Sequence, residues 1–316
     1  MPQGGRHFKP AGQAQKAQQT QPVRPVTRAH AVRPVQTRGN AYTSTHSRAY
    51  SEQSRGHGRP ARPKRRRSIL PIVLIVIGVA LLLTAGGLFI KAQLGYKEAQ
   101  EAYDKLEQYA VSDGSGDGVP SVNFDELEKI NPDIVGWIYV PGTVINYPVV
   151  QADDNTTYLR RLFDLSGNGS GTIFMDMDDA APGMVDQQTT IYGHHMNDNS
   201  MLKHIDDTRD QAVFDSVKTV YYITRDNTYK LKPLFTARVE DDYNEARTPN
   251  FEDEDAFKEY LRTALSNASA KASDAADRID DTKQVLSLVT CAGEIIPRTT
   301  RSVMVCSLEE TTAHQQ

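Results

Sequence analysis

Three residues in the C-terminal half of the chain have the chemical types needed for nucleophilic catalysis by a thiol. Within the segment Leu286–Ser307, a predicted strand ends at Cys291, a loop of nine residues follows, and Arg301 opens the next predicted strand. Upstream, another predicted strand ends directly before Gly193 and His194. A thiol becomes a good nucleophile when a base accepts its proton and a positive field stabilises the thiolate. His194 could supply the base and Arg301 the positive field.

Residue types and spacing alone do not distinguish such a site from an ordinary core. A cysteine is often a small buried hydrophobic residue, and a single histidine is often structural. The chain has two cysteines, Cys291 and Cys306, and no Cys-x-x-Cys pair. These counts exclude a disulfide framework and the usual zinc and redox motifs, and they leave one bridge between the two cysteines open.

The predicted hairpin geometry argues against that bridge. Suppose that Cys291 pairs with Arg301 across the hairpin. Cys306 then faces Leu286, which lies five residues, roughly 17 Å, from the first cysteine along its strand. A disulfide requires Cα atoms within about 7 Å of each other. We therefore predict that Cys306 is a core residue and that Cys291 stays free to react.

Asp176, Asp178 and Asp179 follow another predicted strand and raise the question of a calcium loop. An EF-hand loop needs later ligands that end in a glutamate, and the spacing here lacks them. We interpret the three aspartates as a polar loop that leaves the strand, and we predict no metal site.

The elements that would position the reactive residues are mostly strands. Short runs rich in Val, Ile, Tyr and Thr are separated by Gly, Pro, Asn and Asp, which is typical of strands and turns. Apolar spacing and capping predict two helices, Phe124–Ile130 and Glu252–Ser269. The predicted strands are Ile134–Val140, Tyr147–Gln151, Gly171–Met175, Thr189–Tyr192, Val217–Thr224, Tyr229–Val239, Gln284–Thr290 and Ser302–Ser307. About eight short strands with few helices favour an antiparallel barrel or sandwich.

Residues 1–68 differ from the rest of the chain in composition and charge. They contain 15 basic residues and one acidic residue, a net charge of +14, whereas the remainder has 21 basic and 39 acidic residues, a net charge of −18. The segment has few large apolar residues and no periodic pattern, so we predict a disordered tail. Its charge could contact anionic lipid or nucleic acid, but we favour a solvated tail whose charge sets membrane topology.

An uncharged run of 22 residues, Ile69–Ile90, follows the tail. As a helix it would span roughly 33 Å, enough to cross the roughly 30 Å hydrocarbon core of a bilayer. Basic residues occupy positions 64–67, so the positive-inside rule places the N-terminus in the cytoplasm and the acidic C-terminal part outside. The alternative is a cleaved signal peptide, which the length and late start of the run disfavour.

The chain after the predicted span divides into a connection and a folded domain. Lys97–Val111 has the pattern of a helical stalk and Ser112–Pro120 that of a flexible linker, so residues 91–121 form the predicted connection. The folded domain is predicted over residues 122–310, enough chain for a substantial core, with a short tail over residues 311–316.

Ordered motifs in this domain resemble those of the sortase family. The strand end Leu288-Val289-Thr290-Cys291, with Arg301 opening the next strand, resembles the family's Leu-x-Thr-Cys signature, and Tyr192-Gly193-His194 resembles its second motif. The resemblance covers roughly Val122 to Leu308 and is closest to class B sortases in order and spacing. The segments that carry it are Asn131–Ile138, Tyr147–Gln151, Asp154–Leu159, Ile173–Asp176 and the predicted helix Glu252–Ser269.

Several positions depart from the usual family residues. Val289 stands where Ser or Thr is common, Ala292 follows the predicted nucleophile where a polar residue is frequent, and the last strand ends in Cys306-Ser307. These departures bear on class and substrate preference more than on the chemistry.

The resemblance implies an eight-stranded β-barrel and a cysteine transpeptidase. In the family, the thiolate that matches Cys291 attacks the Thr carbonyl of a C-terminal sorting motif on a secreted protein. A thioester forms, and an amine, usually of a cell-wall precursor, resolves it. By this resemblance His194 would protonate the leaving amine and deprotonate the incoming one, and Arg301 would hold the substrate backbone and the developing oxyanion. No metal or organic cofactor is implied.

Two residues compete for these roles. His195 adjoins His194, but the family histidine directly follows the glycine of the motif, which favours His194. Arg298 lies in the middle of the loop, whereas Arg301 directly precedes the strand. The predicted catalytic set is therefore His194, Cys291 and Arg301.

The implied partners are secreted proteins with a sorting motif, the amine of a peptidoglycan precursor or of a pilin, and the membrane through one N-terminal helix. No nucleic acid is expected. A single-pass protein with an extracellular catalytic domain on a Gram-positive cell envelope follows from the same resemblance.

Two alternatives stay open. One is a pilus-polymerising sortase, which joins subunits through a Lys amine; a second, C-terminal membrane span is common in that branch and is not predicted here. The other is a non-catalytic extracellular barrel that binds the cell wall, for which Cys291 would be buried and unreactive.

Overall fold

The computed structural model describes residues 68–112, 118–167, 170–291 and 299–314, and of Ser112 and Cys291 it describes the backbone. Three features of the sequence analysis lie outside the described residues. They are the predicted tail apart from Ser68, the linker residues 113–117, and Arg298.

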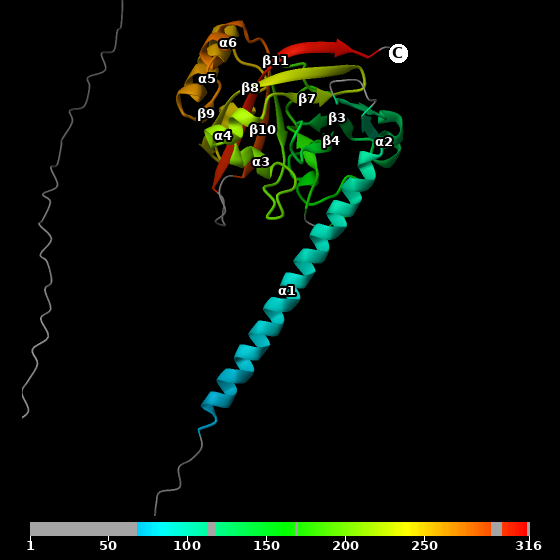
Figure 1. Ribbon diagram of the computed structural model, residues 1–316, viewed down its shortest axis with the longest axis vertical. Coiled ribbons are helices and arrows are strands. Elements are labelled where there is room, and N and C mark those ends of the chain that lie inside the picture. The colour runs from blue at the N-terminus through cyan, green and yellow to red at the C-terminus, as the bar shows by residue number, and fades with distance from the viewer. Residues whose placement is uncertain (1–67, 113–117, 168–169, 292–298, 315–316) are drawn as a thin grey trace, which may run out of the picture. The chain divides into compact units, whose positions relative to one another are not determined.

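Within these ranges, eight strands close into a barrel in the order β11-β10-β6-β5-β4-β3-β7-β8, and β8 pairs back with β11 (Figure 1). Neighbours are antiparallel except for β4 with β5 and β6 with β10, which are parallel. The predicted eight-stranded barrel is confirmed. Its strands are β3 (Ile134–Tyr139), β4 (Asn146–Val150), β5 (Ile173–Met175), β6 (Gln188–Tyr192), β7 (Val220–Ile223), β8 (Asn227–Glu240), β10 (Val285–Cys291) and β11 (Thr300–Ala313).

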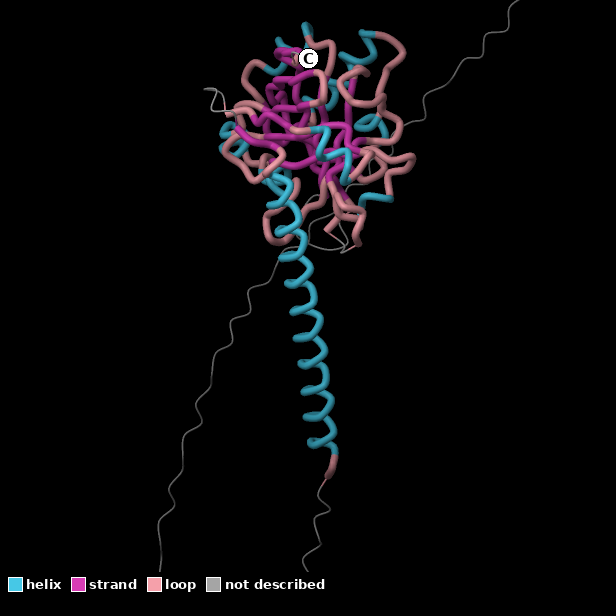
Figure 2. The backbone as a smooth tube through the Cα atoms, turned by 90° about the vertical axis from the view of Figure 1, so that its right-hand side faces the viewer, coloured by secondary structure: helices cyan, strands magenta, loops and turns pink. Residues whose placement is uncertain are grey.

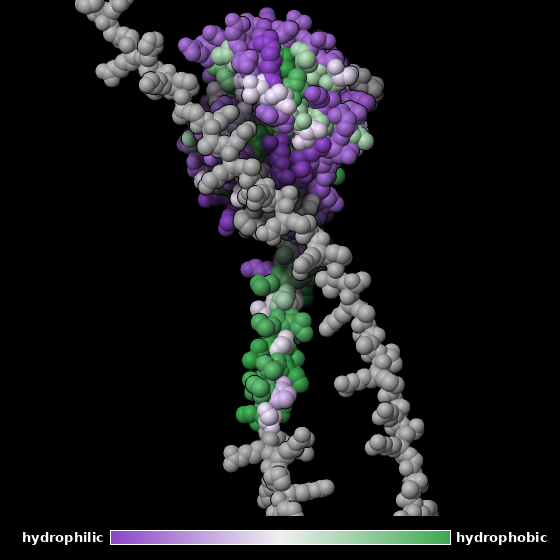
Figure 3. All heavy atoms as spheres, turned by 90° about the vertical axis from the view of Figure 1, so that its left-hand side faces the viewer, coloured by the Kyte–Doolittle hydropathy of each residue, from purple (hydrophilic) through white to green (hydrophobic). Residues whose placement is uncertain are grey.

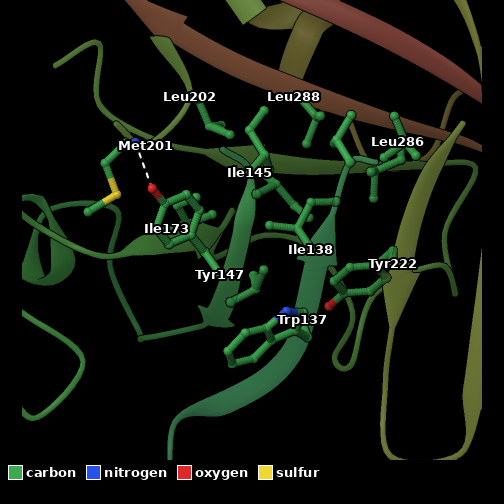
Figure 4. Packing of buried hydrophobic residues seen from close by; sticks show 14 of the residues in the cluster. Trp137, Ile138, Ile145, Tyr147, Ile173, Met201, Leu202, Tyr222, Leu286 and Leu288 are labelled. Carbon is green, nitrogen blue, oxygen red and sulfur yellow. Dashed lines mark hydrogen bonds between the residues drawn. The ribbon is translucent and has the colours of Figure 1, made fainter. Parts of the chain in front are cut away.

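β10 and the part of β11 over Ser302–Ser307 are buried on both faces, which explains the apolar residues at successive positions of both segments. Leu286 and Leu288 point into the main core of the barrel, where Figure 4 shows them near Ile138. Val285 and Val289 pack instead into a second, outer core. This alternation follows from the two-residue period of a strand.

The outer core is covered by α5 (Glu254–Ser266) and α6 (Ala275–Asp281). α5 begins after Asp253, whose side chain accepts a hydrogen bond from Ala256 N–H at 2.8 Å, and it buries the apolar stripe that predicted it. It ends at Ser266, three residues earlier than predicted. The following residues form β9 (Ala268–Lys271) instead, because they pair with the part of β8 that lies beyond its ladder with β7.

The other predicted helix is confirmed, and several short elements were not predicted. α2 spans Phe124–Ile130 and is capped by Asn123, as predicted. The additional elements have three to seven residues, too few to show a period in the sequence. They are α3 (Lys203–Asp207), α4 (Gln211–Ser216), α6, β1 (Ala110–Ser112), β2 (Pro120–Val122), β9 and the 3₁₀ turns η1 (Thr157–Leu159) and η2 (Asn244–Arg247).

The C-terminal strand is longer than predicted. β11 continues to Ala313, through residues that were assigned to a tail, because its ladder with β8 continues as far as Ala313 opposite Asn227.

The predicted membrane span and stalk form one helix. α1 runs from Leu70 to Glu107 without a break (Figure 2). Its N-terminal part is apolar and exposed (Figure 3), and it is the one helix among the described residues that is long and apolar enough to cross a membrane.

The C-terminal part of α1, which covers most of the predicted helical stalk, packs into the main core of the barrel. Ala99, Tyr103 and Leu106 are buried in the main cluster. The Tyr103 hydroxyl donates to Gly171 O at 2.6 Å, and its ring meets that of Tyr147 edge to face at a centroid distance of 5.4 Å. The sequence pattern alone does not reveal this docking because the partners lie 44 or more residues away in the chain.

The ends of the predicted linker are also ordered. β1 and β2 pair antiparallel, with Ala110 opposite Val122 and Ser112 opposite Pro120. The connection between helix and barrel is therefore closed by a two-stranded ladder at its base.

Replacing Tyr103 by alanine should lower the free energy of unfolding of the barrel by about 3–5 kcal/mol, the usual cost of removing a buried aromatic side chain. The change removes a ring that is 6% exposed and leaves Gly171 O without its hydroxyl donor. Chemical denaturation of the full chain in detergent would measure it. The exposed Lys105, two residues away, is the matched control, and its replacement by alanine should change the value by less than about 0.5 kcal/mol. Equal effects of the two changes would contradict the docking of α1.

Candidate active site

The parallel pair β6 and β10 brings the predicted histidine and cysteine together. Tyr192 stands in register with Val289, and Gly193 N–H donates to Val289 O at 3.1 Å. His194 and Cys291 each follow that register pair by two residues. Because neighbouring strands lie about 4.8 Å apart, the two backbones leave the sheet side by side.

The antiparallel pair β10 and β11 adds the arginine. Cys291 stands directly opposite Arg301, and Leu286 stands opposite Cys306, which is the register hypothesised for the hairpin in the sequence analysis. Cys306 is a free thiol in the barrel core, as predicted, and burial raises its pKa. The buried thiol is therefore kept protonated, away from the strand end where Cys291 lies.

The His194 ring is held by the 3₁₀ turn η1. Its Nε2 lies 2.6 Å from Leu159 O, so this ring nitrogen donates to the carbonyl. Gly171 makes room for the ring: a Cβ at this position would lie 2.8 Å from His194 Cδ2, and the backbone there has φ of +67°. Only glycine fits this close approach and this left-handed conformation without strain.

Arg301 and His194 both line a surface cavity of about 290 Å³. Its side chain is 32% exposed, and Nη2 lies 4.0 Å from Asp241 Oδ2. The cavity presents an imidazole, a guanidinium and apolar side chains to one space, and its lining includes Asn155, Leu159, Phe174, Tyr192, His194, Arg247, Val289, Thr290 and Arg301.

An ion pair between the buried Asp176 and the half-buried Arg247 supports one wall of this cavity. Asp176 is fully buried, accepts a hydrogen bond from the Tyr192 hydroxyl at 2.7 Å and pairs with Arg247 Nε at 3.2 Å. Arg247 also contacts Asp178, at 3.0 Å. Burial, and then the nearby Asp176 carboxylate, raise the pKa of Tyr192, so its hydroxyl stays a donor. Arg247 was not found from the sequence, because it lies 55 residues from Tyr192 in a short turn with no motif.

A model of the sortase domain matches residues 138–309, more than half of the chain. The chain belongs to the sortase family. The sortase B of Staphylococcus aureus is 29% identical over 248 residues, which cover 78% of this chain and 98% of that protein. The sortase B of Listeria monocytogenes is 25% identical over 230 residues, which cover 69% of this chain and 91% of that protein.

Solved sortase B structures share the barrel. A Staphylococcus aureus sortase B–substrate complex aligns with a TM-score of 0.58 and 25% identity, covering 69% of this chain and 99% of that one. Bacillus anthracis sortase B in complex with AAEK1 aligns with a TM-score of 0.56 and 26% identity, covering 68% and 98%. The chain is thus a class B-like sortase, and the family assigns it cysteine transpeptidase activity.

The two neighbouring histidines of the sortase lie in different surroundings. His194 is half-buried and lines the cavity. His195 is buried, with its Nδ1 at 3.5 Å from Asp206 Oδ2. Of the two rival arginines, the structure describes Arg301 only. Among the described residues, no group of three or more His, Cys, Asp or Glu side chains is arranged to hold a metal ion.

The third aspartate of the loop has an unusual environment. The pKa of Asp179 is raised to about 8, mainly because the carboxyl is buried and also because the carboxylates of Asp176, Asp186 and Asp178 lie nearby, whereas the hydrogen bond from Thr190 N–H acts to lower it. Among the described residues, its Oδ1 has no hydrogen-bond partner. At pH values below about 8, Asp179 is therefore mostly protonated in the folded sortase.

Replacing Asp179 by asparagine should stabilise the sortase increasingly as the pH rises. In the wild type, the unfolded chain releases this proton near pH 4 and the folded chain near pH 8, so the free energy of unfolding falls between these values. Asparagine has no proton to release. Melting temperatures from pH 4.5 to 8.5 should diverge in favour of the variant, whereas Asp153→Asn, at an exposed position, should follow the wild type. A constant difference across this range would contradict the raised pKa.

Proposed function

We propose that this sortase cleaves a C-terminal sorting motif of secreted proteins through a thioester on Cys291 and transfers the acyl group to an amine of the cell wall. The observation that supports the proposal is the meeting of three strand ends: Cys291 stands opposite Arg301, and His194 leaves the neighbouring strand at the same level. A substrate carbonyl in the cavity beside them would face a nucleophile, a proton carrier and a cation.

Each group has one task in the proposed first step. The Cys291 thiolate attacks the Thr carbonyl of the motif, forming a C–S bond. The positive charge of Arg301 stabilises the oxyanion that develops. The scissile C–N bond then breaks, and the His194 imidazolium gives its proton to the leaving amine.

The second step reverses these roles. An incoming amine attacks the thioester carbonyl and loses a proton to the His194 imidazole. The C–S bond breaks, Cys291 leaves as the thiolate, and the new amide departs. At the end of the second step Cys291 is again a thiolate and His194 again an imidazolium, so the proposed cycle needs no cofactor.

The proposed setting is the outer face of a Gram-positive membrane. Ile69–Ile90 would be the anchor, with the basic residues 1–68 in the cytoplasm and the catalytic domain, residues 122–310, outside. The apolar, exposed N-terminal part of α1 supports this arrangement. Because α1 is continuous with the barrel, the catalytic cavity would be held near the membrane, where lipid-linked wall precursors carry their amines.

The test is turnover of fluorogenic sorting peptides of the LPxTG and NPxTx types by the full chain in detergent, with and without a small amine. Cleavage that the amine diverts into a new adduct, seen by mass spectrometry, would establish transpeptidation, and the preferred peptide would define the motif. Absence of both turnover and thioester in a folded protein would overturn the proposal and favour a wall-binding barrel.

A further inference from the structure

Asp206 is a buried carboxylate that lies behind the candidate active site. The residue is 4% exposed, and its two oxygens contact three side chains. Oδ1 accepts hydrogen bonds from Ser302 Oγ at 2.6 Å and from Arg209 Nε at 2.7 Å. Oδ2 lies 3.3 Å from Arg209 Nη2 and 3.5 Å from His195 Nδ1. One carboxylate thus joins three separate parts of the chain.

Two of these partners adjoin proposed catalytic residues. His195 follows His194, and Ser302 follows Arg301. The strands that lead to them, β6 and β11, do not pair with each other, because β10 lies between them. Asp206 therefore links the two strand ends across β10 through side chains.

His194 depends on this link because it lies beyond the sheet ladder, whose last β6–β10 pair is Tyr192 with Val289. Its loop closes through a hydrogen bond of 3.1 Å from Leu202 N–H to His194 O, and α3 begins at the next residue. α3 packs against β10 and β11 (Figure 1). The position of His194 is therefore coupled to that of α3, which carries Asp206.

The Asp206 contacts lie on the side of β11 that faces away from the cavity. Arg301 lines the cavity, and successive strand residues point to opposite faces, so Ser302 points to the barrel end that α3 covers. Ser302 is fully buried, and Asp206 is not among the residues that line the cavity. Asp206 would thus act through its neighbours and not on the substrate.

The Asp206 carboxylate is held in place by the pairing and hydrogen bonds that compensate for its burial. A buried carboxylate is stable only when it is paired and hydrogen bonded, and Arg209 and Ser302 meet these needs. Loss of the charge would weaken the pairing with Arg209, which keeps the Asp206 backbone carbonyl as an acceptor. Loss of the whole carboxylate would leave the buried Ser302 hydroxyl without this acceptor. α3 and the preceding loop would then shift, and a misplacement of about 1 Å can lower a rate roughly 100-fold.

We propose that Asp206 is a positioning residue of the sortase reaction, which holds His194 and Arg301 in their relative places through His195 and Ser302. The inference rests on the proposed function of His194 and Arg301. Loss of the Asp206 carboxylate should lower kcat and leave KM nearly unchanged, because the side chains that line the cavity are retained.

The first experiment compares Asp206→Asn and Asp206→Ala with Asp207→Asn in the full chain in detergent. Asp207 is the matched control, since it is the next acid in α3 and pairs with Lys203 at the surface. We expect kcat for the cleaved peptide to fall roughly 10- to 100-fold in both Asp206 variants, with KM within about twofold, and the control to match the wild type. If alanine prevents folding, the asparagine variant decides. An unchanged kcat in the folded asparagine variant, or an equal loss in the control, would overturn the inference.

A second readout does not depend on turnover. The His194 ring N–H that donates to Leu159 O should give a protected signal in the nuclear magnetic resonance spectrum, identified by its loss in His194→Asn. We expect Asp206→Asn to broaden or abolish this signal and Asp207→Asn to preserve it. If the wild type cleaves no peptide, the proposed function fails and this signal alone decides the positioning role. A signal unchanged by Asp206→Asn would overturn that role.

Discussion

Replacing Cys291 by alanine should abolish peptide cleavage and amine transfer together, with a loss in kcat of roughly 10⁴-fold or more. The thiolate forms the covalent bond on which both steps depend. The change should leave the fold intact, because the backbone ladder between β10 and β11 holds this position. Turnover and the mass of the trapped thioester would measure the effect.

The second cysteine is the matched control for this prediction. Cys306 lies in the barrel core opposite Leu286, and burial raises the pKa of its thiol. Cys306→Ala should therefore keep catalysis and lower the free energy of unfolding by about 1 kcal/mol through a small cavity. Cleavage that survives in Cys291→Ala, or a thioester found on Cys306, would contradict the proposed nucleophile.

Replacing His194 by asparagine should lower kcat by roughly 10²- to 10⁴-fold, the usual contribution of a positioned acid–base group. The ring faces the cavity and is held by Leu159 O, so its loss removes the proton carrier of both steps. The amine-dependent step should fall with the cleavage step, because the same ring serves both. Single-turnover acylation and amine transfer, measured separately, would test this.

The neighbouring histidine provides the comparison. His195 is buried behind the site and pairs with Asp206, so His195→Asn should cost about tenfold or less in kcat by loosening the position of His194. A larger loss from His195→Asn than from His194→Asn would reverse the assignment of the two residues.

Most of the fold features that could be predicted depend on patterns among residues close together in the sequence. The β-rich runs predicted every strand of the barrel to within a few residues, except for the C-terminal extension of β11. The hairpin hypothesis, which took Cys291 as the partner of Arg301, gave the register that β10 and β11 have in the structure. Antiparallel neighbours joined by a short loop have few alternative registers once one face is buried, which made this hypothesis a useful one.

The surroundings of His194 and Arg301 were less accessible to sequence reasoning. Leu159 and Gly171 hold the His194 ring, and Arg247 pairs with Asp176. Leu159 and Arg247 lie in the short 3₁₀ turns η1 and η2, and Gly171 lies just before β5. Their contacts with His194 and Asp176 join residues 23 to 71 positions apart. Such contacts depend on how loops meet at the end of a closed barrel, and no local propensity encodes that.

The sequence by itself determined the apolar span, the β-rich domain and the motifs of the three proposed catalytic residues, because these depend on composition, period and short-range order. Only the tertiary structure decided that α1 continues into the core through Tyr103, that residues 268–271 form β9, and that Asp206 links the segments after His194 and Arg301. Each of these depends on burial against partners distant in the chain, and burial is settled only when the whole barrel closes.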